Sequence, residues 1–380
     1  MHHLVLQSLP PVFYLAGIFI AFFSSFLILG KAKKIMADYV LAFWFMVIGI
    51  HLIFFMLLWS ETYLKFPYFL GIEIPFPLIH GPMLYLYVLC LTGSAPKRHI
   101  WVFHMIPVFS IYLILINFFL LSSEEKINIY QQGGGVYKML RTYIKVLIVL
   151  SGIVYVGLSI NAVRKYRTKI SGLYSNTEKI NLNWVYYLIA GIALIWFAVI
   201  LKNDLLIFSL VTVFIVVAAY FGISRVRILD HQIPETSEIT ENPMDTSPVA
   251  ISKYEKNFAG EETIQNIHTR LVILMDAEKL YKNPELNLNY VAKLLDVHPN
   301  TLSQTINFIE NKNFYDFINS RRIEEFKRIA LLPENAKYTI LSLALESGFN
   351  SKTSFNRNFK KFMHSSPREF LKSHKVDIEY

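Results

Sequence analysis

The stretch LNLNYVAKLLDVHPNTLSQTINFI, residues 286–309, predicts two short helices around a tight turn. In the second helix Leu302 and Ile306 lie one turn apart and form its inward face. Pro299 suits the first turn of that helix, where its missing N–H costs no hydrogen bond. The outward positions are polar: Asn300, Ser303 and Gln304. This pattern is typical of a helix-turn-helix, whose second helix enters the major groove of DNA.

The stretch FNSKTSFNRNFKKF, residues 349–362, repeats the pattern. Thr339 is expected to cap the helix before it, and Gly348 to end that helix with a positive φ. Phe355 and Phe359 form the inward pair. The outward positions are Lys352, Thr353, Asn356 and Arg357, followed by Lys360 and Lys361. Arginine and asparagine suit base edges, and the two final lysines suit phosphates.

Between the two motifs, residues 313–332 predict one helix that Pro333 stops. Twenty helical residues span about 30 Å, and successive major grooves lie about 34 Å apart on one face of DNA. The helix carries four basic residues: Arg321, Arg322, Lys327 and Arg328. Each either contacts phosphates, faces solvent, or pairs with Glu324 or Glu325. Of these we select Arg321 as a phosphate contact.

The remainder of the chain has a different character. Only 17% of all residues are charged, against roughly 25% in soluble proteins, and the deficit lies in residues 12–223. A membrane span needs about 20 apolar residues. Seven segments meet this: 12–30, 39–59, 72–91, 101–121, 143–163, 184–201 and 205–223. The last two are separated only at Lys202 to Asp204, so six spans is the alternative.

The fold class expected is therefore all-α, a seven-helix (or six-helix) transmembrane bundle plus a soluble domain with two helix-turn-helix subdomains joined by a long helix. Alternate loops carry twelve Lys and Arg, and the opposite loops carry five. Because positive residues concentrate in the cytoplasm, the N-terminus is expected outside a bacterial inner membrane. The multi-pass domain is 1–223, a flexible linker follows at 224–260, and the cytoplasmic DNA-binding domain is 261–380.

Polar residues at membrane depth point to a second candidate site. His51, Glu73, His80 and Asn117 all fall in the outer half of their spans, where polar groups are costly. They either line a ligand pocket open to the outside or hydrogen-bond between helices. The lone Cys90 suits packing. The sequence shows neither a phosphate loop, nor metal-ligand spacing, nor a nucleophile beside a base, so we expect no enzyme, no cofactor and no metal.

The second motif carries a family resemblance. Gly348-Phe-Asn-Ser-Lys-x-Ser-Phe-x-Arg-x-Phe-Lys-Lys361, followed by Ser366-Pro367, resembles the signature of the AraC/XylS transcription regulators over residues 265–373. The resemblance implies two helix-turn-helix subdomains, regulation of transcription, and base contacts at the seven outward residues of both motifs. His364 departs from it, because the family usually has glycine there. The N-terminal half resembles multi-span regions of some AraC-type regulators of Bacteroidetes-like bacteria.

The predicted function is a membrane-tethered, sequence-specific DNA-binding transcription regulator that couples a signal at the membrane bundle to gene expression. Expected partners are double-stranded DNA and the lipid bilayer. RNA polymerase, an unknown small-molecule or membrane signal, and a second copy of the chain are further candidates. The alternative is a transporter or other membrane protein with an appended regulatory domain. A transporter typically shows internal repeats, and the sequence shows none.

Overall fold

The computed structural model describes residues 2–96, 98–178, 180–201, 203–224 and 260–374. These residues form helices and no strand, which confirms the expected all-α class for the described part of the chain. The chain divides into two compact units: unit 1 is Met1–Tyr166 with Leu182–Pro234, and unit 2 is Arg167–Asn181 with Glu235–Tyr380. Nearly all of the linker predicted at 224–260 lies outside the described residues.

All seven apolar segments of unit 1 are helical. The main helices are α1 (His2–Leu29), α2 (Met36–Trp59), α3 (Pro77–Leu91), α5 (Ile106–Ile114), α8 (Lys138–Leu173), α9 (Val185–Ile200) and α10 (Asp204–Ser224). Three helical stretches are long and apolar enough to cross a membrane: Met36–Trp59, Gly135–Leu173 and Leu206–Ser224. The other four apolar helices have 10–17 described residues, so seven spans remains a prediction.

Two of the expected segments differ in detail from continuous helices. α3 begins at Pro77, so Pro75 precedes it, and only Pro82 lies in its interior. The segment 101–121 is divided into a 3₁₀ turn, α5 and the short α6 (Ile116–Phe119). A proline in the first turn of α5 lacks the N–H that a continuous helix would need. Hydrophobicity averaged over a segment does not predict these breaks.

The remaining elements of unit 1 are short. They are η1 (Thr62–Leu64), η2 (Pro67–Phe69), α4 (Arg98–Trp101), η3 (Val102–Met105), α7 (Ser123–Gln131) and η4 (Gly135–Tyr137). Between α9 and α10 the side chain of Asn203 accepts a hydrogen bond from the backbone N–H of Leu206 at 2.9 Å. This cap starts α10 as a new helix. The two C-terminal apolar segments are therefore separate helices.

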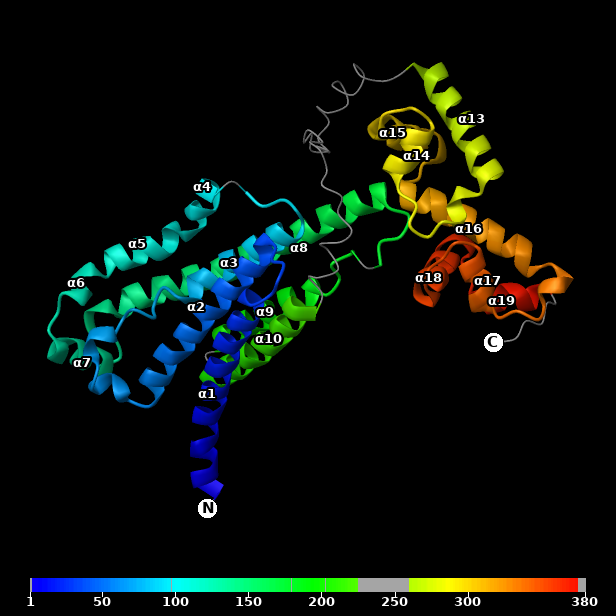
Figure 1. The fold of residues 1–380 in the computed structure, drawn as a ribbon. Coiled ribbons are helices and arrows are strands. Elements are labelled where there is room, and N and C mark those ends of the chain that lie inside the picture. Colours follow the sequence, from blue (N-terminus) through cyan, green and yellow to red (C-terminus); the bar gives the residue numbers. More distant parts are fainter. Residues whose placement is uncertain (1, 97, 179, 202, 225–259, 375–380) are drawn as a thin grey trace. The chain divides into compact units, whose positions relative to one another are not determined.

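The core of unit 1 places α1 against α2 and α10, with α9 against α10 and α3 against α2 (Figure 1). The Lys31 ammonium joins the ends of three of them. It pairs with the buried Asp38 carboxylate at 2.6 Å and donates to the Gly222 carbonyl at 2.6 Å. The C-terminal ends of α1 and α10 consequently lie on the same side of unit 1.

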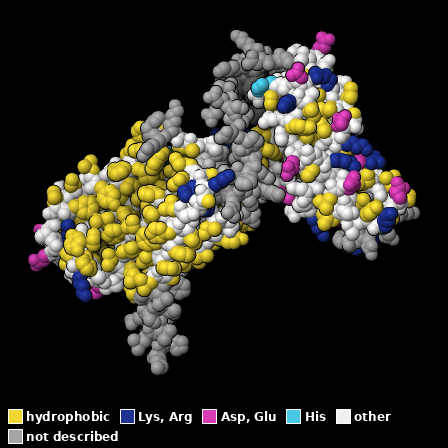
Figure 2. All heavy atoms as spheres, viewed as in Figure 1, with side chains coloured by type: hydrophobic (Ala, Val, Ile, Leu, Met, Phe, Trp, Pro, Cys, Tyr) yellow, Lys and Arg dark blue, Asp and Glu magenta, His cyan; other side chains and the backbone are white. Residues whose placement is uncertain are grey.

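The outside of unit 1 is apolar. Figure 2 shows hydrophobic side chains covering most of its visible face. Large residues are widely exposed there, such as Phe19 at 67%, Phe109 at 64% and Leu113 at 70%. Water-soluble monomers rarely expose contiguous apolar patches larger than a few hundred Å². Such an apolar surface is typical of helices that contact lipid.

Unit 2 consists of helices packed around the central helix α16 (Figure 1). They are α13 (Glu261–Glu278), η5 (Leu280–Lys282), α14 (Leu288–Leu294), α15 (Pro299–Glu310), α16 (Phe314–Ala330), η6 (Pro333–Asn335), α17 (Ile340–Glu346), α18 (Lys352–Met363) and α19 (Pro367–Ser373). The connector α16 has 17 residues, about 25 Å at 1.5 Å each. It is shorter than predicted because Asn313 caps it at one end and Leu331 ends it at the other.

Two hydrophobic cores stabilise unit 2, and α16 contributes to both. The first half of α16 packs Phe314, Phe317 and Ile318 against α13, α14 and α15. The second half packs Ile323 and Phe326, among others, against α17, α18 and α19. Each core contains one helix-turn-helix and one half of α16. The connector therefore holds each motif at a fixed position along its own length.

Candidate nucleic-acid interface

The first helix-turn-helix consists of α14 and α15. Asn287 caps α14 by accepting from the Tyr290 N–H at 3.0 Å. Leu302 and Ile306 of α15 are fully buried, which confirms the predicted inward pair. On the other face Asn300 is exposed, while Ser303 and Gln304 are partly exposed. The exposed Asn307 extends the same stripe by one turn, a position that the sequence reasoning passed over.

The second helix-turn-helix consists of α17 and α18. Thr339 caps α17 as predicted, and Ser351 caps α18 by accepting from the Ser354 N–H at 3.0 Å. Phe355 and Phe359 are buried against Phe326 of the connector. The opposite face exposes every predicted contact residue: Lys352, Thr353, Asn356, Arg357, Lys360 and Lys361. These positions form one polar and basic stripe along the helix without an acidic residue.

Gly348, in the turn between α17 and α18, joins the second motif to the first. Its φ is +97°, so the predicted left-handed conformation is confirmed. A Cβ at this position would lie 2.4 Å from the Tyr281 carbonyl oxygen and 2.7 Å from the Lys282 Cα. Both atoms belong to the backbone of η5, which cannot yield as a side chain does. Glycine is required here by conformation and by space.

Two predicted contact residues are anchored by the connector. Arg357 donates one hydrogen bond to the buried Tyr315 hydroxyl at 2.8 Å, and Asn358 donates to the same oxygen at 2.7 Å. Lys361 pairs with the Asp316 carboxylate at 2.6 Å. Guanidinium has five donors, so the bond from Nη2 to Tyr315 orients the guanidinium group of Arg357 and leaves its other donors for a base.

The basic residues of the connector that are at least partly exposed are held in ion pairs, two of them by acids of the connector and one by an acid of α13. Arg321 pairs with Asp276 at 2.9 Å, and Lys327 pairs with Glu324 at 2.8 Å. Arg328 pairs with the buried Glu325 carboxylate at 2.8 Å. This hydrogen-bonded guanidinium, helped by Lys282, lowers the pKa of Glu325 to about 2. For Arg321 the partner Asp276 is itself exposed, so exchange for a phosphate costs little.

Arg322 takes none of the roles considered for it from the sequence, because the structure buries it. Its Nε donates to the Tyr281 carbonyl at 2.7 Å, and Nη2 donates to the Asn283 carbonyl at 2.8 Å. Its remaining donors reach Asn319 and Ser175. All five N–H groups are thus satisfied by uncharged acceptors. Burial without a carboxylate lowers the pKa of Arg322 to about 10.

His364, the residue that departs from the family pattern, ends α18. It follows the last residue of α18 with a φ of +55° and donates its N–H to the Lys360 carbonyl at 3.0 Å. This left-handed cap is the conformation that glycine adopts most easily. The side chain is therefore accommodated at the cost of backbone strain, and the turn into α19 is still made: Ser366 caps that helix by accepting from Glu369 N–H at 3.2 Å.

Within unit 1, two of the four predicted pocket residues meet. The His51 Nδ1 lies 3.0 Å from the His80 Nε2, and the Trp44 indole donates to the His80 Nδ1 at 3.2 Å. If His80 accepts at Nδ1, its Nε2 carries the proton and donates to His51. Glu73 instead accepts from the Tyr130 hydroxyl at 2.6 Å, and Asn117 is exposed. The histidine pair thus behaves as an interhelical hydrogen bond between α2 and α3.

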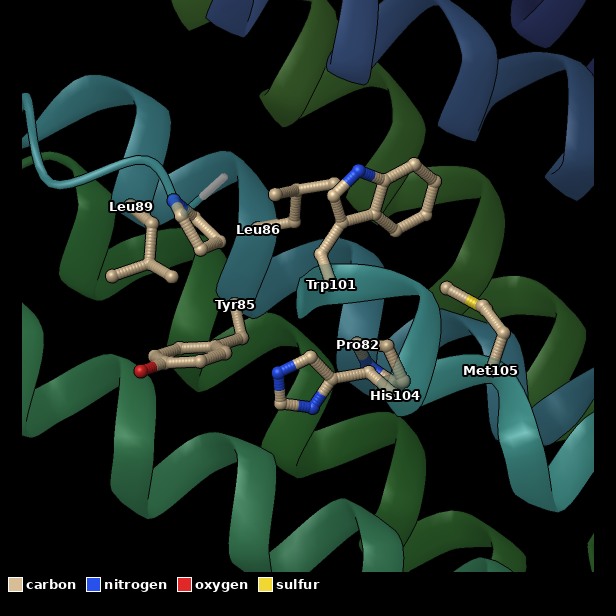
Figure 3. A pocket seen from close by; sticks show the side chains of 8 residues that line it. Pro82, Tyr85, Leu86, Leu89, Trp101, His104 and Met105 are labelled. Carbon is tan, nitrogen blue, oxygen red and sulfur yellow. The ribbon is translucent and has the colours of Figure 1, made fainter. Parts of the chain in front are cut away.

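A small hollow of about 10 Å³, room for about one water molecule, lies beside α3, between it and the segment that follows α4. Figure 3 shows Tyr85 and His104 facing each other across it, with Leu86, Leu89 and Trp101 as apolar walls. The His104 Nδ1 lies 2.8 Å from the Tyr155 hydroxyl. Ligand pockets usually exceed about 300 Å³. Among the described residues there is also no cluster of three His, Cys, Asp or Glu for a metal.

Comparison with known proteins agrees with the geometry of unit 2. Residues 291–373 match the family model described as a helix-turn-helix domain. Two relatives, from Staphylococcus aureus strains COL and MSSA476, are each described as an uncharacterized HTH-type transcriptional regulator and are each 30% identical over 95 residues. The alignment covers 25% of this chain but only 12% of each relative's length. No solved structure matches significantly.

These similarities support a DNA-binding helix-turn-helix domain of the kind found in transcription regulators at the C-terminal end. That part of the sequence resemblance is confirmed. The family match begins at residue 291, so it does not reach unit 1. These similarities therefore say nothing of membrane attachment or of the coupling of a signal.

Proposed function

We propose that the chain is a membrane-anchored transcription regulator that reads double-stranded DNA with α15 and α18. The observation that carries the proposal is the pair of exposed polar stripes on these helices, each mounted on its own core at one end of α16. The reading residues are Asn300, Ser303 and Gln304 in the first stripe, and Lys352, Thr353, Asn356 and Arg357 in the second.

The basic residues beside the stripes contribute in a different way. Lys360 and Lys361 continue the stripe of α18 toward its C-terminal end, and Arg321 lies on the connector. Contacts to phosphates fix the register of a protein on DNA but carry no base information. These three residues therefore position the domain, while the polar residues ahead of them select the sequence.

The membrane attachment is supported by charge, length and packing together. α1 and α10 end on the same side of unit 1, joined through Lys31 and Gly222. An odd number of spans with the N-terminus outside produces this arrangement and brings unit 2 to the cytoplasm of a bacterial cell. The segment 167–181 belongs to unit 2, and charge asymmetry independently assigns the same loop to the cytoplasmic side.

The DNA-reading role is tested with the full chain in lipid nanodiscs. A random-sequence duplex library is selected by the wild type, and the enriched duplex is then used for affinity measurements. Arg357→Ala is expected to lose about 1–3 kcal/mol and to relax selection at one base pair. Lys360→Ala is expected to weaken all sequences alike and to reduce the salt dependence by about one phosphate contact.

Lys33→Ala, in the exposed loop between α1 and α2, is the matched control because it removes the same charge from unit 1. It is expected to leave the selected sequence and the affinity unchanged. Failure of the wild type to enrich any sequence would refute sequence-specific binding. An Arg357→Ala variant that selects the same sequence with the same affinity would show that α18 does not enter the groove.

Topology is tested by labelling cysteines in spheroplasts in a Cys90→Ala background. Ser123→Cys lies at the first residue of α7, on the side expected outside, and Ala32→Cys lies in the loop expected inside. A membrane-impermeant maleimide is expected to label the first directly and the second only after permeabilisation. The opposite pattern would place unit 2 outside the cell and exclude the proposed function.

We propose further that the hydrogen-bonded chain of Trp44, His80 and His51 is where unit 1 responds to a signal. The pair is the one place in unit 1 where two predicted pocket residues touch. His80→Phe removes both hydrogen bonds and keeps an aromatic ring. If transcript profiles of cells carrying this variant match wild type in every growth condition, the histidine pair is only structural.

A further inference from the structure

The chain segment directly after α8 is built into unit 2. α8 has 36 residues, about 54 Å at 1.5 Å each, which exceeds the roughly 30 Å of a bilayer core. Its last seven residues, Arg167–Leu173, already belong to unit 2. Leu173 packs against the hydrophobic core of the first helix-turn-helix. The residues that follow, 174–178, are called the plug below.

Ser175 is the centre of the plug and is 1% exposed. Its hydroxyl donates to the Leu286 carbonyl at 2.7 Å and accepts from Arg322 Nη2 at 3.0 Å. Its carbonyl accepts from Arg322 Nη1 at 3.1 Å and from Asn319 Nδ2 at 3.0 Å. Beside it Tyr174 forms an antiparallel bridge with Asn287, the cap of α14.

The buried guanidinium of Arg322 on α16 depends on the plug for part of its hydrogen bonding. Two of the five hydrogen bonds of Arg322 end on Ser175, so withdrawal of the plug leaves donors of a buried guanidinium without acceptors. An unsatisfied buried donor is costly, and more so for a charged group. An arginine buried without a carboxylate is thus explained as a receptor for this segment of the chain.

The plug also reaches the second reading helix. The Ser351 hydroxyl, which caps α18, donates to the Glu178 carboxylate. The negative charge therefore lies at the N-terminal end of α18, where exposed backbone N–H groups favour an anion. In helix-turn-helix complexes this end of the reading helix enters the major groove, between two rows of phosphates. A carboxylate there repels the phosphates and occupies the positive end of the helix.

We propose that residues 174–178 are an intramolecular inhibitory plug. Docked, they place the Glu178 carboxylate on the DNA-entering end of α18 and weaken DNA binding; withdrawn, they leave that end open. The plug is continuous with α8, so a displacement of this helix along its axis moves the plug directly, without passing through residues 225–259. The proposal rests on the proposed DNA-reading function.

The test uses the full chain in nanodiscs and the duplex that the wild type selects. Glu178→Gln keeps a hydrogen-bond acceptor for Ser351 and removes only the charge. At about 4 Å from a phosphate in water one charge contributes about 1 kcal/mol, so the duplex is expected to bind about fivefold tighter at 0.1 M salt. Because salt screens charges, the affinities of wild type and Glu178→Gln for the duplex should become nearly equal at 1 M salt.

Glu262→Gln is the matched control. It removes the same charge from an exposed position in the first turn of α13, and its affinity is expected to equal that of wild type. Ser175→Phe is a second probe, because a phenyl ring cannot fit at a fully buried serine beside Arg322. It should speed hydrogen exchange of residues 174–178 and tighten DNA binding by at least as much as Glu178→Gln.

The outcomes separate the two proposals. If wild type selects no duplex, the proposed function fails whatever the plug does. If wild type binds and Glu178→Gln binds equally or more weakly, the plug is not inhibitory and the inference is overturned. A gain in affinity that is the same at 0.1 M and 1 M salt would also overturn it, because a charge effect must be screened.

Discussion

Replacing Gly348 by alanine tests the joint between the two helix-turn-helix motifs. Its φ of +97° disfavours any L-residue by about 1–2 kcal/mol. The new Cβ would also lie 2.4 Å from the Tyr281 carbonyl oxygen and 2.7 Å from the Lys282 Cα. Relieving such overpacking typically costs about 1–3 kcal/mol. The sum predicts a loss of about 2–5 kcal/mol for unit 2.

Hydrogen exchange of the full chain in nanodiscs measures this loss. In the regime where exchange reports opening free energy, about 3 kcal/mol corresponds to roughly 150-fold faster exchange of core amides, here in α16 and α18. Gly172→Ala is the control, because a Cβ in that helical position meets nothing within 4 Å. It should change exchange by less than about fivefold. Equal exchange for wild type and Gly348→Ala would refute the close approach.

Three further predictions concern unit 2. Arg322→Met should cost about 3–5 kcal/mol, because it leaves the buried carbonyls of Tyr281 and Asn283 without donors; exchange of α16 as slow as in wild type would contradict this. His364→Gly should stabilise by about 1 kcal/mol through relief of its positive φ, seen as a higher urea midpoint, whereas a lower midpoint would show that the strain is absent. The pKa of Glu325 lies at about 2 in the folded state, below its ordinary value of 4.5, so its contribution is complete above pH 4.5 and is lost as pH falls toward 2. Unit 2 should lose on the order of 2 kcal/mol over this range, and Glu325→Gln should flatten the dependence; an equally steep curve would contradict the assignment.

The sequence predicted local features of unit 2 well, because they depend on neighbours in the chain. The inward pairs Leu302–Ile306 and Phe355–Phe359, the cap Thr339 and the positive φ of Gly348 all follow from helical periodicity and from cap chemistry. The exposure of the polar stripe on α18 follows from the same periodicity. Base and phosphate contacts at these residues remain predictions.

Features set by distant residues were beyond the same reasoning. Arg322 reads as one more surface charge on the connector, since nothing nearby in sequence shows that carbonyls 39 and 41 residues earlier surround it. Ser175 lies in a basic loop 147 residues from its partner. In unit 1, hydrophobicity located the apolar helices, but it did not reveal the breaks inside 101–121, only one of which coincides with the proline in the first turn of α5.

The two halves of the connector α16 lie in two different cores, so α16 sets the distance and the angle between α15 and α18. In the proposed complex the two half-sites must follow its length and its pitch. One added base pair between them would rotate the second half-site by about 34–36° around the DNA axis, since a turn holds 10–10.5 base pairs. Neither core can follow that rotation without breaking the helix that both share. Spacing would therefore be recognised as strictly as the bases themselves, although no side chain touches the intervening pairs.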